Sequence, residues 1–217
     1  MAKLRYRFHS LEFGDTDIHL RTLRDNQQFD DPRGLAEEMG ILSSSWPMFG
    51  VLYAAGEVLA RSMQHYDIRG LRILEVGCGI GLSSLVLNER LADITASDYH
   101  PEAEVFLQYN ARLNNSRPIP FFRSAWAESC AGIAKFDLII GSDLLYQPDH
   151  AGMLSGFINQ HAKQACSVII VDPQRGNGPS FCRHMNGFEF THTRIRHEEN
   201  AAMTQPFKGH VLSFSRS

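Results

Sequence analysis

The sequence is poor in the patterns that build metal sites and disulfide frameworks. Its 217 residues contain four widely separated cysteines and no Cys-x-x-Cys pair, so neither a structural zinc site nor disulfide bonds are expected. The ten histidines show no His-Glu-x-x-His or similar spacing, and we therefore expect no metal. A reducing compartment, the cytoplasm, suits this composition.

The sequence also lacks long apolar runs and an excess of basic charge. No stretch approaches the roughly 18–20 apolar residues that a membrane-spanning helix needs. The first ten residues include basic side chains but no apolar segment, so no signal peptide is expected. The formal net charge of −3 argues against a protein that binds nucleic acid through a general basic field. We therefore expect no membrane partner, and nucleic acid is disfavoured as a partner, although the net charge still allows a local basic patch.

From residue 70 onward, apolar segments rich in β-branched residues alternate with amphipathic ones. Such alternation is typical of an α/β fold in which helices cover both faces of a parallel sheet. We predict a Rossmann-like sheet of seven strands, mostly parallel, in which the last strand is antiparallel because no helix precedes it. Strands are expected at 71–76, 93–98, 118–126, 136–143, 165–172, 188–196 and 209–217, and helices at 82–90, 101–114, 148–163 and 179–187.

Residues 1–66 follow a different pattern, and we expect them to form an N-terminal extension that packs on a cofactor-binding domain of residues 67–217. Alternating residues on either side of a turn near Gly14 predict a small hairpin. After a polar loop, apolar residues recur on one helical face and predict an amphipathic helix from about 49 to 66. Pro47 lies near its start, where proline is tolerated in a helix.

Three glycines at alternate positions, in the stretch ILEVGCGIGL, predict a ligand-binding loop. Gly77, Gly79 and Gly81 follow an expected buried strand, and glycine lets the backbone turn tightly and approach a ligand closely. Asp98 ends the next strand, where a carboxylate can accept hydrogen bonds from both hydroxyls of a ribose. The loop and the carboxylate together predict a cofactor that contains adenosine, bound at the carboxyl edge of the sheet.

The details of the loop distinguish between cofactors of this kind. A dinucleotide fingerprint needs Gly-x-Gly-x-x-Gly, but Leu82 occupies the third glycine position, which disfavours a dehydrogenase. The sequence has no Gly-x-x-x-x-Gly-Lys-Ser/Thr motif for nucleoside triphosphates. Glu75, just before the loop, would repel a phosphate but suits a ligand with an amino group and a cationic centre.

The stretch ILEVGCGIGLSS, followed by ASD, resembles the cofactor half of class I, seven-strand S-adenosylmethionine-dependent methyltransferases. The acidic-x-Gly-x-Gly-x-Gly motif of that family is matched in full, and the resemblance covers roughly residues 70–217. It implies S-adenosylmethionine as the cofactor, with its ribose on Asp98. It further implies that the methionine part lies along the loop, which contains Glu75, Gly77, Cys78, Gly79 and Gly81.

A narrower resemblance lies in the stretch SDLLY at the end of the fourth expected strand. Asp143 and Tyr146 match the acidic-x-x-Tyr motif of a group of seven-strand protein lysine methyltransferases. Leu144 and Leu145 stand where Asn/Asp-Pro-Pro-Tyr motifs have prolines, which disfavours methylation of DNA amino groups. In this interpretation Asp143 holds and orients the acceptor amine, Tyr146 forms an aromatic wall or a hydrogen bond to the amine, and Ser142 lines the pocket through its backbone.

Two tryptophans extend this resemblance to the cofactor. Trp46 precedes the expected N-terminal helix, as in that group, and is assigned to the cofactor site. Trp126 matches a tryptophan that borders the adenine. The group often has aspartate just before it, whereas this chain has Ala125, so a neighbouring backbone group or Glu128 is left to accept from the adenine amino group.

We therefore expect an S-adenosylmethionine-dependent methyltransferase that acts on a lysine of a protein substrate. The first alternative is a small-molecule N-methyltransferase with the same fold. A non-catalytic cofactor-binding scaffold is disfavoured by the intact loop, Asp98 and Asp143. Asp172 and Arg175, after the fifth expected strand, belong either to the substrate rim or to a loop that they tie together, and we favour the second role for Arg175.

Overall fold

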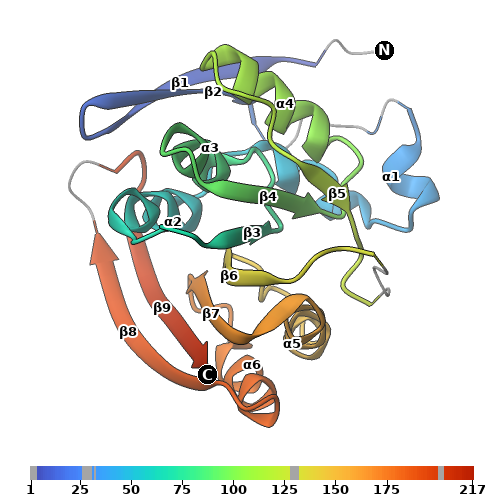
Figure 1. The fold of residues 1–217 in the computed structure, drawn as a ribbon. Helices are drawn as coiled ribbons and strands as arrows, with labels where there is room; N and C mark the ends of the chain where they lie inside the picture. Colours follow the sequence, from blue (N-terminus) through green and yellow to red (C-terminus); the bar gives the residue numbers. More distant parts are fainter. Residues whose placement is uncertain (1–3, 26–30, 32, 128–131, 200–202) are drawn as a thin grey trace.

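A seven-stranded sheet forms the centre of the computed structural model, which describes residues 4–25, 31, 33–127, 132–199 and 203–217 (Figure 1). The strand order is β5-β4-β3-β6-β7-β9-β8, and a separate two-stranded hairpin, β1–β2, precedes it. The strands are β1 Tyr6–Phe13, β2 Thr16–Leu23, β3 Arg72–Val76, β4 Asp93–Asp98, β5 Phe121–Arg123, β6 Phe136–Ser142, β7 Ala162–Asp172, β8 Thr191–Glu199 and β9 Phe207–Arg216.

The five strands from β5 to β7 are parallel, and β9 runs antiparallel to both of its neighbours, β7 and β8. The predicted fold, with its antiparallel last strand, is confirmed. The chain proceeds outward from β3 through β4 to β5, then returns to place β6 on the other side of β3. Ligands of open α/β sheets bind where the order reverses in this way, at the carboxyl ends of the strands.

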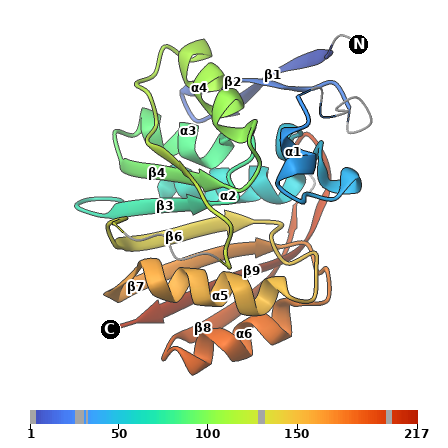
Figure 2. The ribbon, with the colours of Figure 1, turned by 90° about the vertical axis from the view of Figure 1, so that its right-hand side faces the viewer.

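Helices cover both faces of the sheet because alternate strand residues point to opposite sides (Figure 2). Ile73 of β3 belongs to a core cluster shared with α2, α3 and α4, whereas Leu74 belongs to a second cluster shared with α5 and α6. Of the helices in the described residues, none is long and apolar enough to cross a membrane. The helices are α1 Leu35–Glu38, α2 Ala54–His65, α3 Leu82–Glu89, α4 Ala103–Leu113, α5 His150–His161 and α6 Gly178–Gly187.

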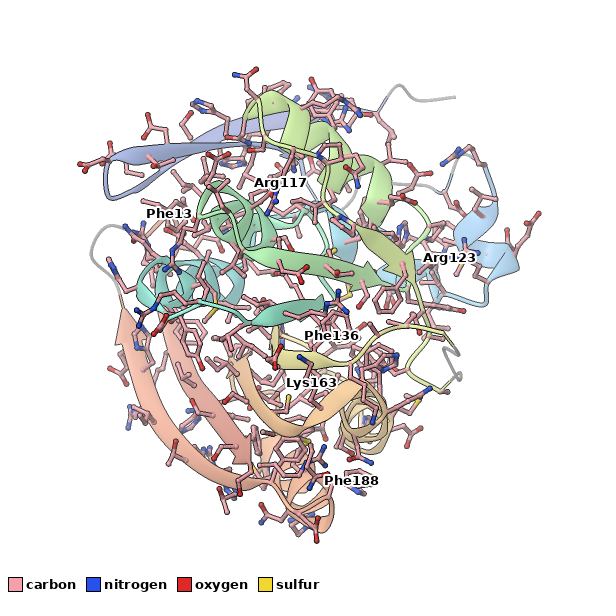
Figure 3. All side chains as sticks on the ribbon, viewed as in Figure 1. Phe13, Arg117, Arg123, Phe136, Lys163 and Phe188 are labelled. Carbon is pink, nitrogen blue, oxygen red and sulfur yellow. The ribbon has the colours of Figure 1, made fainter. Side chains whose placement is uncertain are left out.

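Side chains fill the layers between the sheet and the helices (Figure 3). Phe136, at the start of β6, is buried in the second cluster. Phe13, at the end of β1, is buried in the first, and the guanidinium carbon of Arg61 from α2 lies 5.4 Å from the centroid of its ring. The hairpin and α2 therefore share the core of the sheet. The division of the chain at residue 66 stays a prediction.

The hairpin is held to α4 by two asparagines that replace a neighbouring strand. The backbone N–H of His19 donates to Asn114 Oδ1 at 2.7 Å, and Asn114 Nδ2 donates to the His19 carbonyl at 2.7 Å. Asn110 does the same for Arg21, at 2.8 Å and 3.3 Å. These bonds satisfy backbone groups that an edge strand would otherwise expose.

The predicted helix over 49–66 is wrong at its start. Helix α2 begins at Ala54, and two short 3₁₀ turns, Ser43–Ser45 and Met48–Gly50, precede it. Pro47 stands before the second turn instead of opening α2. A Cβ on Gly50 would lie 2.5 Å from Leu23 Cδ1, so the chain here presses against the hairpin. Tertiary packing thus overrides the helical periodicity of this stretch.

The strand expected over 118–126 is also shorter, because β5 pairs only over Phe121–Arg123. Pro118 and Pro120 have no N–H to donate to a sheet. The Pro120 carbonyl still accepts from the N–H of Ala96 at 2.9 Å, so the chain runs alongside β4 before the ladder begins.

Candidate active site

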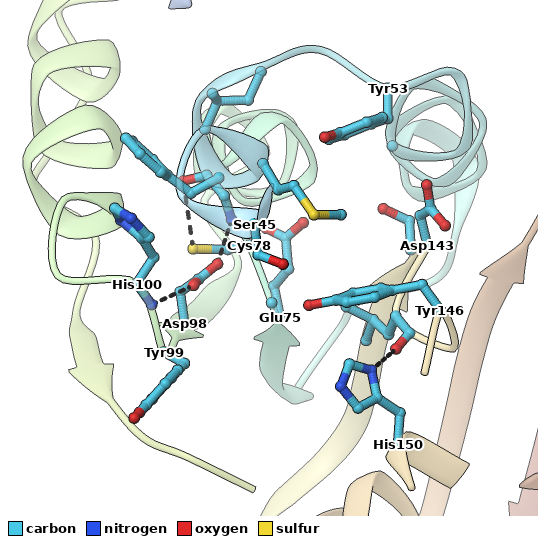
Figure 4. Close-up of a pocket in the computed structure, with 18 of the residues that line it drawn as sticks. Ser45, Tyr53, Glu75, Cys78, Asp98, Tyr99, His100, Asp143, Tyr146 and His150 are labelled. Carbon is cyan, nitrogen blue, oxygen red and sulfur yellow. Dashed lines mark hydrogen bonds between the residues drawn. The ribbon is translucent and has the colours of Figure 1, made fainter. Parts of the chain in front are cut away.

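A cavity of about 410 Å³ lies at the carboxyl ends of β3, β4 and β6 (Figure 4). Its size is that of a small-molecule site. One side carries Asp98 and His100, the opposite side carries Tyr53, Asp143 and Tyr146, and Glu75 lies between them. The segment that contains the two 3₁₀ turns contributes a roof of mostly apolar side chains, from Ile41, Met48, Phe49, Val51 and Leu52.

The glycine loop needs its glycines for backbone conformation and for packing. Gly77, Gly79 and Gly81 have φ angles of 62°, 53° and 80°, in the left-handed region that glycine adopts most easily. Gly81 also forms the N-cap of α3. A Cβ on Gly79 would lie 2.8 Å from the backbone oxygen of Phe49 in the roof. The loop is therefore pressed directly against the roof of the cavity.

Asp98 connects the end of β4 to this loop. Its Oδ2 accepts from the N–H of Gly79 at 2.8 Å, and its Oδ1 accepts from the N–H of His100 at 2.8 Å. Burial raises the pKa of Asp98, against the opposing effect of these hydrogen bonds. Each carboxylate oxygen has a further lone pair, so Asp98 can fix the loop and still accept from a ligand in the cavity.

His100 and the roof meet next to Asp98. The Phe49 and His100 rings are stacked, with their centroids 3.9 Å apart and their planes at 15°. Burial lowers the pKa of His100 to about 4, so its ring is neutral at physiological pH. This stack links the roof to the β4 end of the cavity.

Glu75 is buried at the end of β3 and faces the start of α3. Its Oε2 accepts from the Ser84 N–H at 2.9 Å and from the Ser84 hydroxyl. Burial raises the pKa of Glu75 to about 7. The adjacent Cys78 is also buried, and burial raises the pKa of its thiol well above the ordinary value, which makes it a poor nucleophile.

Asp143 stands just beyond β6 in a strained conformation, with a φ angle of 53°. Its N–H donates to the Val171 carbonyl at 2.9 Å, which holds the backbone against β7. Arg175 donates to both of its carboxylate oxygens, from Nε to Oδ1 at 2.9 Å and from Nη2 to Oδ2 at 2.7 Å. The Asp143 side chain is 10% exposed and that of Arg175 is 46% exposed.

Aromatic rings form the wall next to Asp143. The Tyr146 ring lies edge-on to His150, with centroids 4.4 Å apart, and Trp126 packs against the same histidine at 5.1 Å. His150 Nδ1 donates to the Leu144 carbonyl at 2.8 Å, which fixes its tautomer because a carbonyl only accepts. Burial is the main cause that raises the pKa of Tyr146, and it raises that of Tyr53 to about 12.

The structure brings most of the residues predicted for the site to one cavity. Gly81 forms the N-cap of α3 and is not among the residues that line the cavity. Trp46 is not among them either, because its Nε1 donates to the Ile41 carbonyl at 2.8 Å and its ring packs on the core. The roles assigned to these residues stay predictions. The predicted residues that line the cavity are Glu75, Gly77, Cys78, Gly79, Asp98, Trp126, Ser142, Asp143 and Tyr146.

Sequence reasoning missed several cavity residues. Phe49 and Tyr53 lay inside a stretch predicted to be plain amphipathic helix, and His100 and His150 belong to no recognisable spacing. No short-range pattern marks these four residues, since the fold alone brings them together. Glu128, the alternative partner for the adenine amino group, lies outside the described residues.

A glycine loop after the first parallel strand, a carboxylate closing the next strand and a cavity at the reversal of strand order together define the fold of a class I, S-adenosylmethionine-dependent methyltransferase. A solved example is magnesium protoporphyrin IX methyltransferase from Synechocystis with bound S-adenosylmethionine, which has a TM-score of 0.59 and 20% sequence identity. The alignment covers 75% of this chain and 78% of that one. The chain belongs to the lysine methyltransferase family, whose model matches residues 44–187.

Two curated relatives agree with this family. The electron transfer flavoprotein beta subunit lysine methyltransferase of Xenopus laevis is 26% identical over 167 residues, 73% of this chain and 66% of the relative. Protein N-lysine methyltransferase METTL21A of Danio rerio is 30% identical over 116 residues, 48% of this chain and 53% of the relative. The chain thus spans about two thirds of the first relative and half of the second. The resemblance drawn from the two sequence motifs is confirmed.

Proposed function

We propose that this chain transfers a methyl group from S-adenosylmethionine to the side-chain amine of a lysine in a protein substrate. The observation that carries the proposal is the shared cavity. The glycine loop and Asp98 border one end of it, and Asp143 and Tyr146 of the lysine-methyltransferase motif border the other. A donor and an acceptor bound at these two ends would meet inside one site.

The donor set of the cavity fits S-adenosylmethionine. When bound, this cofactor supplies a methyl group on a positively charged sulfur. Asp98 offers carboxylate oxygens to ribose hydroxyls, and the roof around Phe49 and Met48 offers an apolar surface to a base. The carboxyl groups of Glu75 and Asp98 border the glycine loop, and no lysine or arginine is among the described residues that line the cavity, which suits a cationic ligand better than a phosphate.

The acceptor end suits an amine whose proton must be removed. A lysine ammonium has an ordinary pKa near 10.4, and an apolar, aromatic surrounding lowers that value by desolvation. Tyr53 and Tyr146 supply such a surrounding. Asp143 then orients the amine, and the proximity of the two reactants replaces any need for covalent catalysis.

Partial exposure of the acceptor end favours a protein substrate over a small molecule. Tyr146 is 38% exposed, while Asp143 beside it is nearly buried. A long lysine side chain can reach a buried carboxylate from a rim that stays open to solvent. A small-molecule amine would be better held by a site closed on all sides.

The experiment that tests the proposal is methylation of a cell extract. The purified protein is incubated with the extract and S-adenosylmethionine that carries an isotope-labelled methyl group, and labelled species are identified by mass spectrometry. Label on lysine of a protein is the expected result. Label found only on metabolites would establish the small-molecule alternative, and Asp143→Ala protein serves as the blank.

A further inference from the structure

We propose that Arg175 is a positioning residue for methyl transfer, which holds both oxygens of Asp143 and cancels its charge so that the acceptor amine binds in its neutral, nucleophilic form. The inference rests on the proposed function. It also revises the sequence-based interpretation of Arg175 as a residue that merely ties a loop.

The need for such a residue follows from elementary electrostatics. A carboxylate beside an amine favours the charged ammonium, which has no lone pair and cannot attack a methyl group. Asp143 alone would therefore bind lysine in the unreactive form. A fixed guanidinium on the far side of the carboxylate opposes this effect, by roughly one to two pKa units of the amine at a separation of about 7 Å.

The geometry places Arg175 behind Asp143, not in front of it. Asp143 lines the cavity and Arg175 does not. The arginine approaches with both donors in the paired arrangement that carboxylates prefer, at 2.9 Å and 2.7 Å. The cavity side of Asp143 thus stays open to an amine while the ion pair persists.

The loop that carries Arg175 is built to hold this position. Asp172 at the end of β7 accepts from the backbone N–H of Gln174 at 3.0 Å and of Arg175 at 3.4 Å. Asn177, two residues further on, donates from Nδ2 to the Leu145 carbonyl at 2.9 Å. The loop after β7 is therefore fixed at both ends, once to its own strand and once to the Asp143–Tyr146 segment.

The other charged and titratable groups around Asp143 do not replace Arg175. Tyr53 from the start of α2 and Tyr146 from the same loop both have a raised pKa and stay neutral. Asp98, which acts on Tyr146 across the cavity, and Asp172, which acts on Arg175, are carboxyl groups and supply no positive charge. Glu75 and His150 also line the cavity, and neither supplies a fixed cation.

The chemical step balances with the amine in this form. The nitrogen lone pair forms the new N–C bond, and the C–S bond of the donor breaks with its electron pair on sulfur, which becomes a neutral thioether. The nitrogen becomes a methylammonium and later releases a proton to solvent. One proton must therefore leave the lysine before transfer. Arg175 favours the loss of this proton, because it offsets the negative charge of Asp143.

The test uses a bisubstrate probe, an adenosine derivative that carries a primary aminoalkyl arm in place of the transferable methyl group. Calorimetry at pH 9 in buffers of different ionisation enthalpy counts the protons released on binding. The free arm is charged at this pH, so the wild-type protein should release more than about half a proton per probe. Arg175→Gln should release almost none, and Arg175→Lys, which keeps the charge, should resemble wild type.

A matched control is available on the surface. Arg69 makes the same two-donor ion pair with Asp67, also at 2.9 Å and 2.7 Å, but in an exposed turn. Arg69→Gln should leave the proton count unchanged. Equal proton release from wild type and Arg175→Gln would overturn the inference. If Arg175→Gln also bound the probe more tightly than wild type, Arg175 would instead block the site.

A second compound separates this inference from the proposed function. It carries a methyl group where the probe carries its amine. If wild type binds the two compounds equally well, the cavity has no amine site and the proposed function itself fails. If wild type prefers the amine but the proton counts of wild type and Arg175→Gln agree, only the role of Arg175 is wrong.

Discussion

The contact between the glycine loop and the roof leads to a sharp prediction for Gly79→Ala. The new methyl group would lie 2.8 Å from the backbone oxygen of Phe49, at a residue that is 5% exposed and stacked on His100. Backbone cannot move aside as a flexible side chain can. The roof must therefore shift away from the loop, which deforms the cavity that both of them line.

A control variant separates this contact from backbone strain. Gly70 has a similar φ of 71°, but its Cβ would meet nothing within 4 Å. The left-handed conformation costs an alanine about 1–2 kcal/mol. About 0.4–1 kcal/mol of this cost is offset, because alanine lowers the conformational entropy of the unfolded chain. Gly70→Ala should thus lower the free energy of unfolding by about 1 kcal/mol, whereas Gly79→Ala adds an overpacking cost of about 1–3 kcal/mol.

The assay is chemical and thermal unfolding of both variants, followed by calorimetry with S-adenosylhomocysteine. For a chain of this size each kcal/mol moves the melting temperature by about 2–4 °C. Gly79→Ala should melt well below Gly70→Ala and bind the ligand about tenfold more weakly or worse. Equal destabilisation of the two variants, with unchanged affinity in Gly79→Ala, would refute a roof that presses on the loop.

Three further predictions concern the carboxylates of the cavity. Asp98→Asn should weaken S-adenosylmethionine binding about 10- to 100-fold by calorimetry, because an amide has one oxygen that accepts hydrogen bonds where the carboxylate has two. Unchanged affinity would exclude Asp98 from the cofactor site. Asp143→Ala should abolish labelling of the substrate while cofactor affinity stays within about threefold, and a collapse of that affinity would reassign Asp143 to the cofactor. The pKa of Glu75 is raised from 4.5 to about 7, so the native state keeps a proton that the unfolded chain loses between these values. The free energy of unfolding should therefore fall by up to about 3 kcal/mol as pH rises through that window, relative to Glu75→Gln, and stay level above it; parallel stability curves would show that Glu75 titrates normally.

Local sequence was enough to predict the sheet and to bring the glycine loop and Asp98 to one cavity. The buried strands can be recognised in the sequence from their β-branched residues. The three glycines of the loop and Asp98 lie within 22 residues of one another. Their spacing is dictated by one strand–loop–helix–strand unit, so sequence distance and spatial distance agree. The same holds for Asp143 and Tyr146, which share a single loop.

The roof and the far side of Asp143 could not be predicted in the same way. Residues 49–53 belong to the stretch whose periodicity predicted a helix from about residue 49, but the chain forms a short turn there, in contact with the hairpin and with Gly79. Arg175 is separated from Asp143 by 32 positions and meets it only because β6 and β7 are neighbours. Such pairs depend on strand order and register, which no local pattern contains.

The hydrogen bonds of Asn110 and Asn114 of α4 with the backbone of the hairpin show how far side chains on a helix can replace the hydrogen bonds of a neighbouring strand. Four helical residues rise about 6 Å, and two residues of an antiparallel strand rise about 6.8 Å. Asn110 and Asn114 can therefore match Arg21 and His19 with only a slight mismatch. A further rung would be out of step by more than about 1 Å. The turn of the hairpin beyond His19 is thus free of this constraint, and its length can change without disturbing α4, whose Phe106 ring packs edge-on against Phe49 of the roof.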